Sequence, residues 1–393
     1  MSQPYLIQLQ PLGNFFFGGE RTFGDDNLQY FVRSRYFPQQ TTLLGMLRYK
    51  ILEWKNLLED RRTGARLSSD AIQWIGPSSF NGLSTNFGII KALSALFLML
   101  DGEAAWPIPM DYNLMYSEKG AGRHSVLIKG DSHDFLPQLE GFDPKEGISE
   151  GLLNHSGKYL GLESIFKKVD QVGIQKTTFL SDRTEEKKAF YKQTFIRLKN
   201  TKSAFAFILW LDKQHSTSFQ AHISKFPMVS LGGERSMFRM QMKQIENVRE
   251  YLTIPISHKL GKQESNYTRI ILLSDAFVSA SIFQNCQFAI TQAATFRHIH
   301  TNVRATKYYN ELYKHKGSST SGIDKSSNIN EKKLYKSRAY NLLKAGSVFY
   351  AKSADQLKAI KKILNKSTAF QMIGYNNYIS VNGTQTPFYH TIN

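Results

Sequence analysis

Cysteine is almost absent from this chain of 393 residues, in which Cys286 is the single example. One thiol excludes an intramolecular disulfide and any zinc site built from several cysteines, and it fits a reducing compartment. Long apolar runs are also lacking, because the longest, Ala92–Leu100, is far too short to cross a bilayer and predicts a buried helix. The opening MSQPYLIQLQPLG has neither the basic region nor the apolar core of a signal peptide. We therefore expect a soluble, cytoplasmic protein with no membrane partner.

Acidic residues are scarce relative to basic ones. Lys and Arg number 50 against 32 Asp and Glu, which gives a formal net charge of +18 and a sequence pI near 9.7. Such a surplus, together with 13% aromatic residues, favours a polyanionic partner, since Lys and Arg that neutralise phosphates release counterions. The alternative is a basic surface that serves solubility alone. No long basic amphipathic helix points to a membrane surface.

Motifs that define enzymes are missing. The sequence contains no Walker loop, no HD pair and no G-x-S-x-G. His298 and His300 have no acidic ligand set nearby, and the adjacent carboxylates Asp25–Asp26 and Glu185–Glu186 do not by themselves build a metal site. The sequence therefore predicts no cofactor, no metal and no catalytic residue. As the alternative, His124 or His133 would act as a general acid or base in a metal-independent RNase.

The most informative stretch is Met228–Met240 (MVSLGGERSMFRM), where a short apolar strand meets Gly232–Gly233, followed by Glu234 and Arg235. Adjacent glycines allow a positive φ angle and the close approach of another chain. Successive N–H groups in such a turn bind anions, and a guanidinium adds a fork suited to phosphate. Upstream, Ser216–Ser218 supplies N-cap residues for a helix that extends to about Lys225.

A similar ending occurs near the C-terminus. Ser353 and Gln356 form a capping box, and the following helix has an apolar face and a lysine face. After it comes Gly374, then Tyr375 and Asn376, which we expect to be exposed. The order helix, glycine loop, strand thus occurs twice in the sequence, which predicts a duplicated α+β unit.

Arginines surround a further glycine turn. Gly18–Gly19–Glu20–Arg21 repeats the tetrapeptide at 232–235, and Arg33 and Arg35 precede a helix that Thr41 or Thr42 would cap. A helix N-terminus attracts anions, so we expect Arg33 and Arg35 to contact phosphate. For Arg48 both a phosphate contact and a pairing with a carboxylate at the core edge remain open.

The element order predicts the fold class. Strands are expected at 5–9, 172–174, 190–199 and 203–211, the last two forming a hairpin that turns at Asn200–Lys202. The order strand, helix, two strands, helix, glycine loop, strand is that of a ferredoxin-like domain. We therefore predict an α+β protein with two ferredoxin-like domains, 1–245 and 246–393, carrying irregular insertions at about 112–170 and 306–336.

The motifs resemble the third Cmr subunit of type III-B CRISPR effector complexes, a member of the RAMP superfamily in the group that handles the 5′ tag of the guide RNA. Seven segments carry this resemblance in the family's order: PLGNFFFGGERTFG (Pro11–Gly24), YFPQQTTLLGMLR (Tyr36–Arg48), WPIPMD (Trp106–Asp111), VGI (Val172–Ile174), LGGER (Leu231–Arg235), AGSVFY (Ala345–Tyr350) and IGYN (Ile373–Asn376).

The resemblance implies a non-catalytic subunit that grips the 5′ tag of the guide RNA and contacts the large polymerase-like subunit and the Cmr backbone subunit. The RNA-facing candidates carried over by motif are Gly18, Gly19, Arg21, Arg35, Gln39, Thr41, Gly232, Gly233, Arg235, Gly374 and Asn376. Two alternatives are kept: a RAMP endoribonuclease that processes guide RNA, and a structural adaptor without direct RNA contact.

Overall fold

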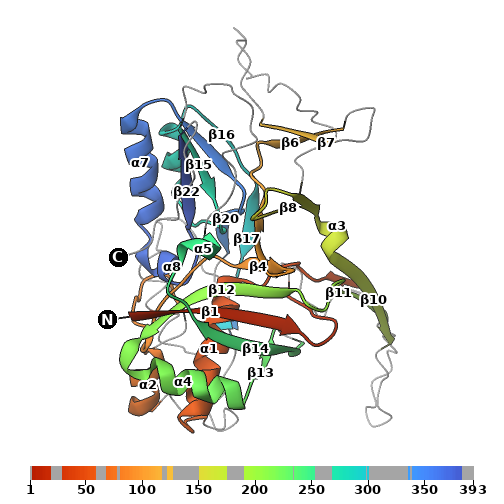
Figure 1. Ribbon diagram of the computed structural model, residues 1–393, viewed down its shortest axis with the longest axis vertical. Coiled ribbons are helices and arrows are strands. Elements are labelled where there is room, and N and C mark those ends of the chain that lie inside the picture. The colour runs from red at the N-terminus through yellow and green to blue at the C-terminus, as the bar shows by residue number, and fades with distance from the viewer. Residues whose placement is uncertain are drawn as a thin grey trace, which may run out of the picture.

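The computed structural model of the chain describes residues 2–18, 29–58, 68–77, 80–116, 122–126, 150–174, 190–232, 234–252, 268–297, 299–300, 335–336 and 339–382. They form a mixed α/β structure in which sheets predominate and helices are few (Figure 1).

The largest sheet has nine strands and is built around β1 (Ser2–Pro11). β1 pairs antiparallel with β12 (Ala204–Asp212) on one side and with β14 (Ser236–Gln244) on the other. The sheet continues as β13 (Met228–Leu231) beyond β14, and as β4 (Phe97–Leu100), β5 (Glu103–Pro107), β8 (Gly151–Asn154) and β9 (Tyr159–Gly161) beyond β12, with β3 (Ile90–Leu93) also paired to β12.

The central strands β12 and β4 are buried on both faces and are near-continuous apolar runs, whereas β13 and β14 expose alternate residues. One face packs under the helices α1 (Gln40–Trp54), α2 (Ser69–Ile75) and α4 (Lys213–Lys225), as Figure 1 shows. Phe205, Phe207 and Leu209 alternate along one face of β12, and all three lie in the core beneath these helices.

The opposite face packs against a four-stranded sheet of the C-terminal half, with strand order β16 (Phe288–Ile290), β21 (Val348–Ala351), β15 (Thr268–Leu272), β22 (Tyr378–Asn382). α7 (Ala354–Asn365) covers the outer side of that sheet. Ser353 caps α7 by accepting a hydrogen bond from the Gln356 N–H, as the capping box predicts. The layers are thus helix, sheet, sheet and helix.

A buried ion pair joins the two halves. Arg269, on β15, donates from Nε and Nη2 to the carboxylate of Asp111 at 2.7 and 2.6 Å, and the Tyr350 hydroxyl donates to the same carboxylate. The two charged side chains are nearly inaccessible to solvent. Removing one partner of such a pair leaves an uncompensated charge in the interior.

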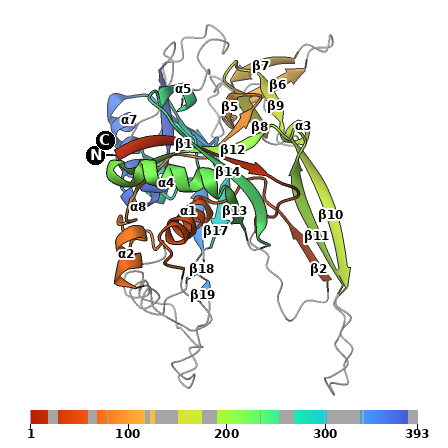
Figure 2. The same ribbon diagram turned by 60° about the horizontal axis from the view of Figure 1, so that its bottom comes forward.

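Smaller elements complete the structure. A three-stranded ribbon of β10 (Phe166–Ile174), β11 (Phe190–Leu198) and β2 (Gln29–Arg33) projects from the edge of the molecule (Figure 2). The remaining elements are α3 (Leu162–Ile165), α5 (Arg249–Leu252), α8 (Thr368–Met372), the 3-10 helix η2 (Ala280–Gln284), and the strand pairs β6 (Tyr112–Tyr116) with β7 (Gly122–Val126), β17 (Ala293–Phe296) with β20 (Tyr340–Leu343), and β18 (Ile299–His300) with β19 (Tyr335–Lys336).

The predicted helix at Ala92–Leu100 is wrong, because this run forms the end of β3 and the whole of β4. Leu96 and Leu98 belong to one core and Phe97 and Met99 to the other. A strand buried on both faces reads as a continuous apolar run, and periodicity does not separate it from a buried helix.

The predicted hairpin at Asn200–Lys202 is also wrong, although both strands exist. β11 pairs with β10 and β2, whereas β12 pairs with β1, β3 and β4. The turn, in which the Ser203 N–H donates to the Asn200 carbonyl, therefore carries the chain from one sheet to another.

Two helix starts differ from the prediction. α1 begins at Gln40 after Gln39, so neither Thr41 nor Thr42 is its N-cap. α4 begins at Lys213 and is capped by Asp212, which accepts from the Gln214 N–H, so Ser216–Ser218 lies inside the helix.

The segment 112–170 was expected to be irregular, and its described part is not. β8 and β9 extend the large sheet, and α3 leads into β10. The predicted insertion at 306–336 lies almost entirely outside the described residues.

Candidate nucleic-acid interface

The turn at 232–235 lies directly against the chain that leads into the first glycine turn. Gly232 has a φ of +79°, and a Cβ atom there would come within 2.3 Å of the Phe16 carbonyl oxygen. The Phe16 N–H donates to Ser236 Oγ at 2.9 Å. Phe16, which precedes the first GGER tetrapeptide in the sequence, thus contacts Gly232 and Ser236, more than two hundred residues away in the sequence.

The segment Arg33–Arg35 joins the same cluster. The Arg35 N–H donates to the Phe17 carbonyl at 2.9 Å, and the Phe17 N–H donates to Ser34 Oγ at 2.9 Å. Three stretches distant in sequence, 16–18, 33–35 and 232–236, therefore form one surface, which we call the glycine-loop surface.

Four described residues of the glycine-loop surface are exposed, namely Gly18, Arg33, Glu234 and Arg235. Nothing lies within 4 Å of a Cβ built at Gly18. Arg235 has a left-handed φ of 49° and its N–H donates to the Gly232 carbonyl at 3.2 Å. The turn holds the Arg235 backbone while its side chain faces solvent beside the exposed Glu234. An exposed guanidinium next to open backbone suits a phosphate.

Other predicted residues lie deeper. Arg35 is half-buried and its Nη2 donates to the Thr295 carbonyl at 2.9 Å. Gln39 Oε1 accepts from the Tyr375 hydroxyl at 2.8 Å, and Thr41, in the first turn of α1, also hydrogen-bonds Tyr375. These residues tie the start of α1 to the C-terminal half.

Arg48 is half-buried. Its guanidinium carbon lies 5.5 Å from the centre of the Phe87 ring, and burial lowers the pKa of Arg48 to about 10. Of the two roles left open by the sequence, this environment favours a structural role over a phosphate contact.

The predicted exposure of Tyr375 and Asn376 is wrong. Tyr375 is 1% exposed and Asn376 is fully buried. Asn376 accepts from the Phe277 N–H at 2.7 Å and donates to the carbonyls of Phe277 and Leu364, each at 3.0 Å. A Cβ atom at Gly374 would come within 2.3 Å of the Ser94 carbonyl oxygen. This third glycine turn is enclosed by protein because it lies where the two halves meet.

Gly19, Arg21 and Gly233 lie outside the described residues, as does His133, and the side chain of His124 on β7 is not described either. Ser34 and Ser236, whose hydroxyls hold the glycine-loop surface together, were not predicted from the sequence. Each directly follows an arginine, Arg33 or Arg235, and that neighbourhood was the available signal.

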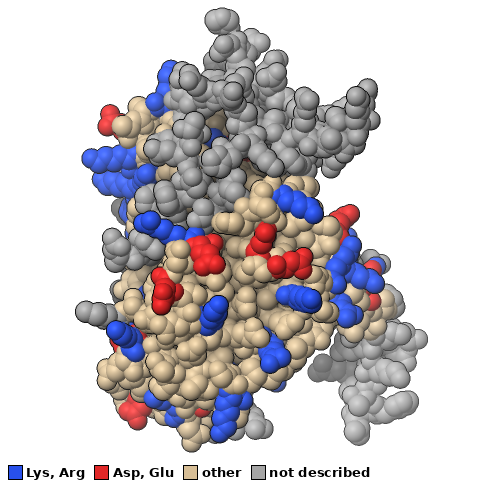
Figure 3. All heavy atoms as spheres, in the orientation of Figure 1, with Lys and Arg blue, Asp and Glu red and all other residues tan. Residues whose placement is uncertain are grey.

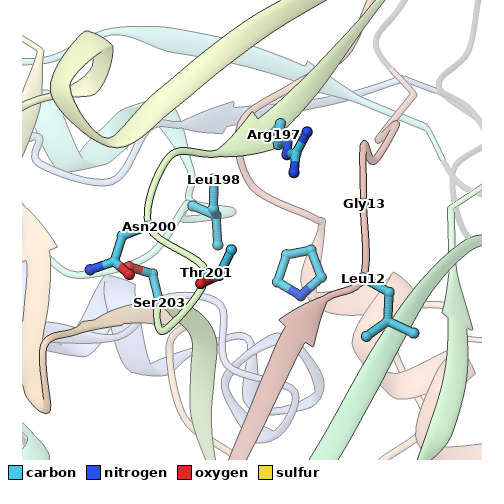
Figure 4. Close-up of a pocket in the computed structure, with 8 residues that line it drawn as sticks. Leu12, Gly13, Arg197, Leu198, Asn200, Thr201 and Ser203 are labelled. Carbon is cyan, nitrogen blue, oxygen red and sulfur yellow. The ribbon is translucent and has the colours of Figure 1, made fainter.

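Charge alone does not locate an interface. In Figure 3 the Lys and Arg side chains are spread over the visible face, and several acidic side chains lie in its middle. A pocket of about 50 Å³ lies between Leu12–Gly13 and the β11–β12 turn, with Arg197 at its edge (Figure 4). That volume is enough for a few water molecules and too small for a nucleotide.

Within the described ranges, no group of three or more His, Cys, Asp or Glu side chains could hold a metal ion. No helix among the same residues is long and apolar enough to span a membrane.

The fold and surface thus define a mixed α/β protein whose packed sheets present converging glycine turns with exposed arginines. A family model described as CRISPR-associated protein (Cas_Cmr3) matches residues 7–382, and this chain belongs to that family. The resemblance to the third Cmr subunit of type III-B CRISPR effector complexes is thereby confirmed.

Solved structures of low sequence identity resemble the chain. A chain of the type III-B Cmr-beta complex bound to cognate target RNA is 14% identical over 96% of both chains, with a TM-score of 0.45. A chain of the same complex with target RNA and AMPPnP is 13% identical over 96% of both chains, with a TM-score of 0.46. A chain of the Csm3–Csm4 subcomplex of the type III-A interference complex is 10% identical over 99% of both chains, with a TM-score of 0.40. No curated protein matches the chain.

Proposed function

We propose that this chain binds the 5′ tag of the guide RNA in a type III-B CRISPR effector complex, and that the glycine-loop surface is where the RNA backbone lies. The observation that carries the proposal is the convergence of Gly18, Arg33 and Arg235 on one exposed surface. Open backbone lets a strand approach closely, and the exposed arginines neutralise phosphates.

The proposed architecture is a pair of ferredoxin-like domains, 1–245 and 246–393. In the first, the strands β14, β1 and β12 lie adjacent with α1 and α4 on one face. In the second, β21, β15 and β22 lie adjacent with α7 on one face. Each half thus has a sheet with one helical face, which supports the duplication.

As partners in the assembled ribonucleoprotein we propose the large polymerase-like subunit and the Cmr backbone subunit, which the chain would bridge. Exposed apolar side chains supply contact area for such partners, among them Leu12, Met228 and Met237 on the β13–β14 side and Val172 on the projecting ribbon. Crosslinking in the assembled complex would show which subunit covers which side.

The proposed role includes no RNA cleavage. Repeat RNA incubated with the purified chain in EDTA should stay intact. Specific cleavage that is lost in His124→Ala or His133→Ala would instead establish the metal-independent endoribonuclease.

Arg235→Ala tests the tag-binding proposal. We expect weaker binding of tag RNA and a shallower dependence of log Kd on log salt, because one phosphate contact is lost. The salt slope should fall by roughly 0.7 for single-stranded RNA.

Lys358→Ala on α7 is the matched control, since it removes one exposed positive charge from a different part of the molecule (Figure 1). Equal losses in Arg235→Ala and Lys358→Ala would mean that RNA responds to net charge alone. An unchanged slope in Arg235→Ala would remove the glycine-loop surface from the RNA path, and an absence of RNA crosslinks there would favour the adaptor.

A further inference from the structure

A groove of about 610 Å³ opens between the two halves and reaches Arg35 of the glycine-loop surface. Its walls come from the segment before α1, the end of β5, the start of β8 and the turn after β15. That volume lies within the range of sites that enclose small organic ligands. Its lining is predominantly apolar, and few polar groups converge on it.

One of these polar groups is a buried acceptor without a partner. Gln40, the first residue of α1, lines the groove and is 5% exposed. Its Nε2 makes only long contacts with the carbonyls of Ser94 and Gly374, at 3.4 and 3.3 Å. Its Oε1 has no hydrogen-bond partner among the described residues. A buried acceptor left in this state costs free energy until a donor reaches it.

The second polar group is the carboxylate of Asp275, which also lines the groove. Its Oδ1 accepts from the Ala345 N–H at 3.0 Å, and Gln39 hydrogen-bonds the same carboxyl group. Burial raises the pKa of Asp275, opposed by those hydrogen bonds and by the charge of Arg35. Gln40 Oε1 and the carboxyl group of Asp275 are therefore two acceptors in the lining of the groove.

The groove is also lined by aromatic rings and by charged side chains. Tyr36 and Phe37 line it, and their ring centres lie 4.9 and 5.8 Å from that of Phe166. Arg35 and Lys344 line it too, with Glu150 4.0 Å from Lys344. Aromatic walls stack planar groups, and the cations attract a phosphate.

We propose that this groove binds a guanine nucleotide, with the base between the aromatic walls, its N1–H and N2 amino group donating to Asp275 and Gln40 Oε1, and its phosphate near Arg35 and Lys344. Guanine presents two adjacent donors on its Watson–Crick edge. Adenine and cytosine place an acceptor beside their amino group, and that acceptor would face a carboxylate. The inference goes beyond tag binding at the glycine-loop surface, with which the groove shares Arg35, because it concerns recognition of a base rather than of a backbone.

A guanine can come from a free nucleotide or from one base of an RNA strand, and both sources present the same edge. Isothermal titration of the full-length chain with GMP, AMP and IMP tests the shared chemistry. IMP keeps the N1–H and lacks the amino group. We expect GMP to bind about tenfold or more tightly than AMP or IMP, the size of discrimination that paired hydrogen bonds give.

Asp275→Asn probes the carboxylate. The amide can keep its acceptor on the Ala345 N–H and then turns a donor toward the base, so GMP should lose about tenfold in affinity and its advantage over AMP. Asp355→Asn, an exposed acid on α7, is the matched control and should change neither value. If Asp275→Asn does not fold, the GMP-to-IMP ratio of the unaltered chain still decides the question.

A second arm separates the sources. Polyuridine RNA with a single guanine is compared with the same RNA carrying a single adenine. If the unaltered chain binds the guanine RNA more tightly than the adenine RNA but does not bind GMP, the groove holds a base of an RNA strand. Binding of GMP itself assigns it to a free nucleotide. Equal affinity for guanine and adenine in both arms, or a guanine preference that survives Asp275→Asn, overturns the proposal.

Discussion

The turns at Gly232–Arg235 and Gly374–Asn376 have the same backbone signature and opposite surroundings. Each contains a glycine with positive φ, 79° or 92°, followed by a non-glycine residue in the left-handed region, Arg235 at 49° or Asn376 at 57°. In each, a Cβ on the glycine would come within 2.3 Å of a carbonyl oxygen of a distant segment. Arg235 is nevertheless exposed, whereas Asn376 is fully buried.

Position in the fold explains the difference. The first turn joins β13 to β14 at the edge of the large sheet, so protein covers it on one side only. The second follows α8 where the two halves meet, so protein surrounds it. Closed surroundings require every polar group to be paired within the protein, and open surroundings leave groups for a ligand. A glycine turn is therefore evidence of close approach, and its surroundings decide whether the approaching group is protein or ligand.

The largest expected effect of this contrast is on stability. Asn376→Ala removes one acceptor and two donor contacts, and leaves the Phe277 N–H and the Leu364 carbonyl buried without this partner. We expect the free energy of unfolding to fall by about 3–5 kcal/mol, because each unpaired buried group costs about 1–3 kcal/mol. Urea unfolding followed by circular dichroism measures it. Asn341→Ala, at an exposed position on β20, is the control, and an equal loss in both variants would contradict the comparison.

A smaller effect is expected at the open turn. Gly232→Ala forces a positive φ on alanine and places its Cβ against the Phe16 carbonyl, so we expect a loss of about 2–3 kcal/mol. Gly18→Ala, in the same surface but with nothing near its Cβ, should change stability by less than about 0.5 kcal/mol. Thermal unfolding of the two variants gives the difference. Equal shifts in Tm would show that Phe16 moves away without cost.

A feature of these regions can be predicted from the sequence when the contacts that form it are local. The capping box of α7, the strands β1, β11 and β12, and the glycine turn before β14 were predicted, since capping, alternation and turn chemistry are short-range. The strand character of Ala92–Leu100 was not predicted, because two separate cores cover its two faces.

The same reasoning applies to the candidate site. That Gly232 faces Phe16, and that Asn376 faces Phe277, depends on pairings between distant segments. Residue types give no sign of such pairings, so the sequence indicated glycine turns and arginines without indicating which turn is open. Duplication of a pattern then suggested, wrongly, that Tyr375 and Asn376 are exposed like Arg235.

Alkaline pH should lower the stability of the protein through Tyr375, in the buried turn Gly374–Asn376. Burial, and then the nearby charge of Asp275, raises the pKa of Tyr375 above its ordinary value. Below about pH 10 the tyrosine is neutral in both states and its contribution to stability is complete. Above that pH the unfolded chain loses the proton while the folded chain keeps it, so stability falls by about 1.4 kcal/mol per pH unit for this group.

Unfolding free energies measured from pH 8 to 11.5 check this expectation. Tyr375→Phe should reduce the slope of unfolding free energy against pH in the alkaline range. The lost hydrogen bond to Gln39 should also lower the unfolding free energy by the same amount at every pH. Tyr49→Phe, at an exposed position, should leave the slope as it is. A slope identical in all three proteins would mean that Tyr375 titrates freely in the folded state.

The smallest stability effect is expected at Arg235. Its side chain is exposed, and alanine can take the same left-handed backbone at a similar cost, so Arg235→Ala should change the free energy of unfolding by less than about 0.5 kcal/mol. Tag RNA affinity should nevertheless fall, because the guanidinium is available to phosphate and not used by the fold. A large loss of stability in Arg235→Ala would show that the open turn depends on its arginine as the closed turn depends on Asn376. The contrast between a binding turn and a structural turn would then be lost.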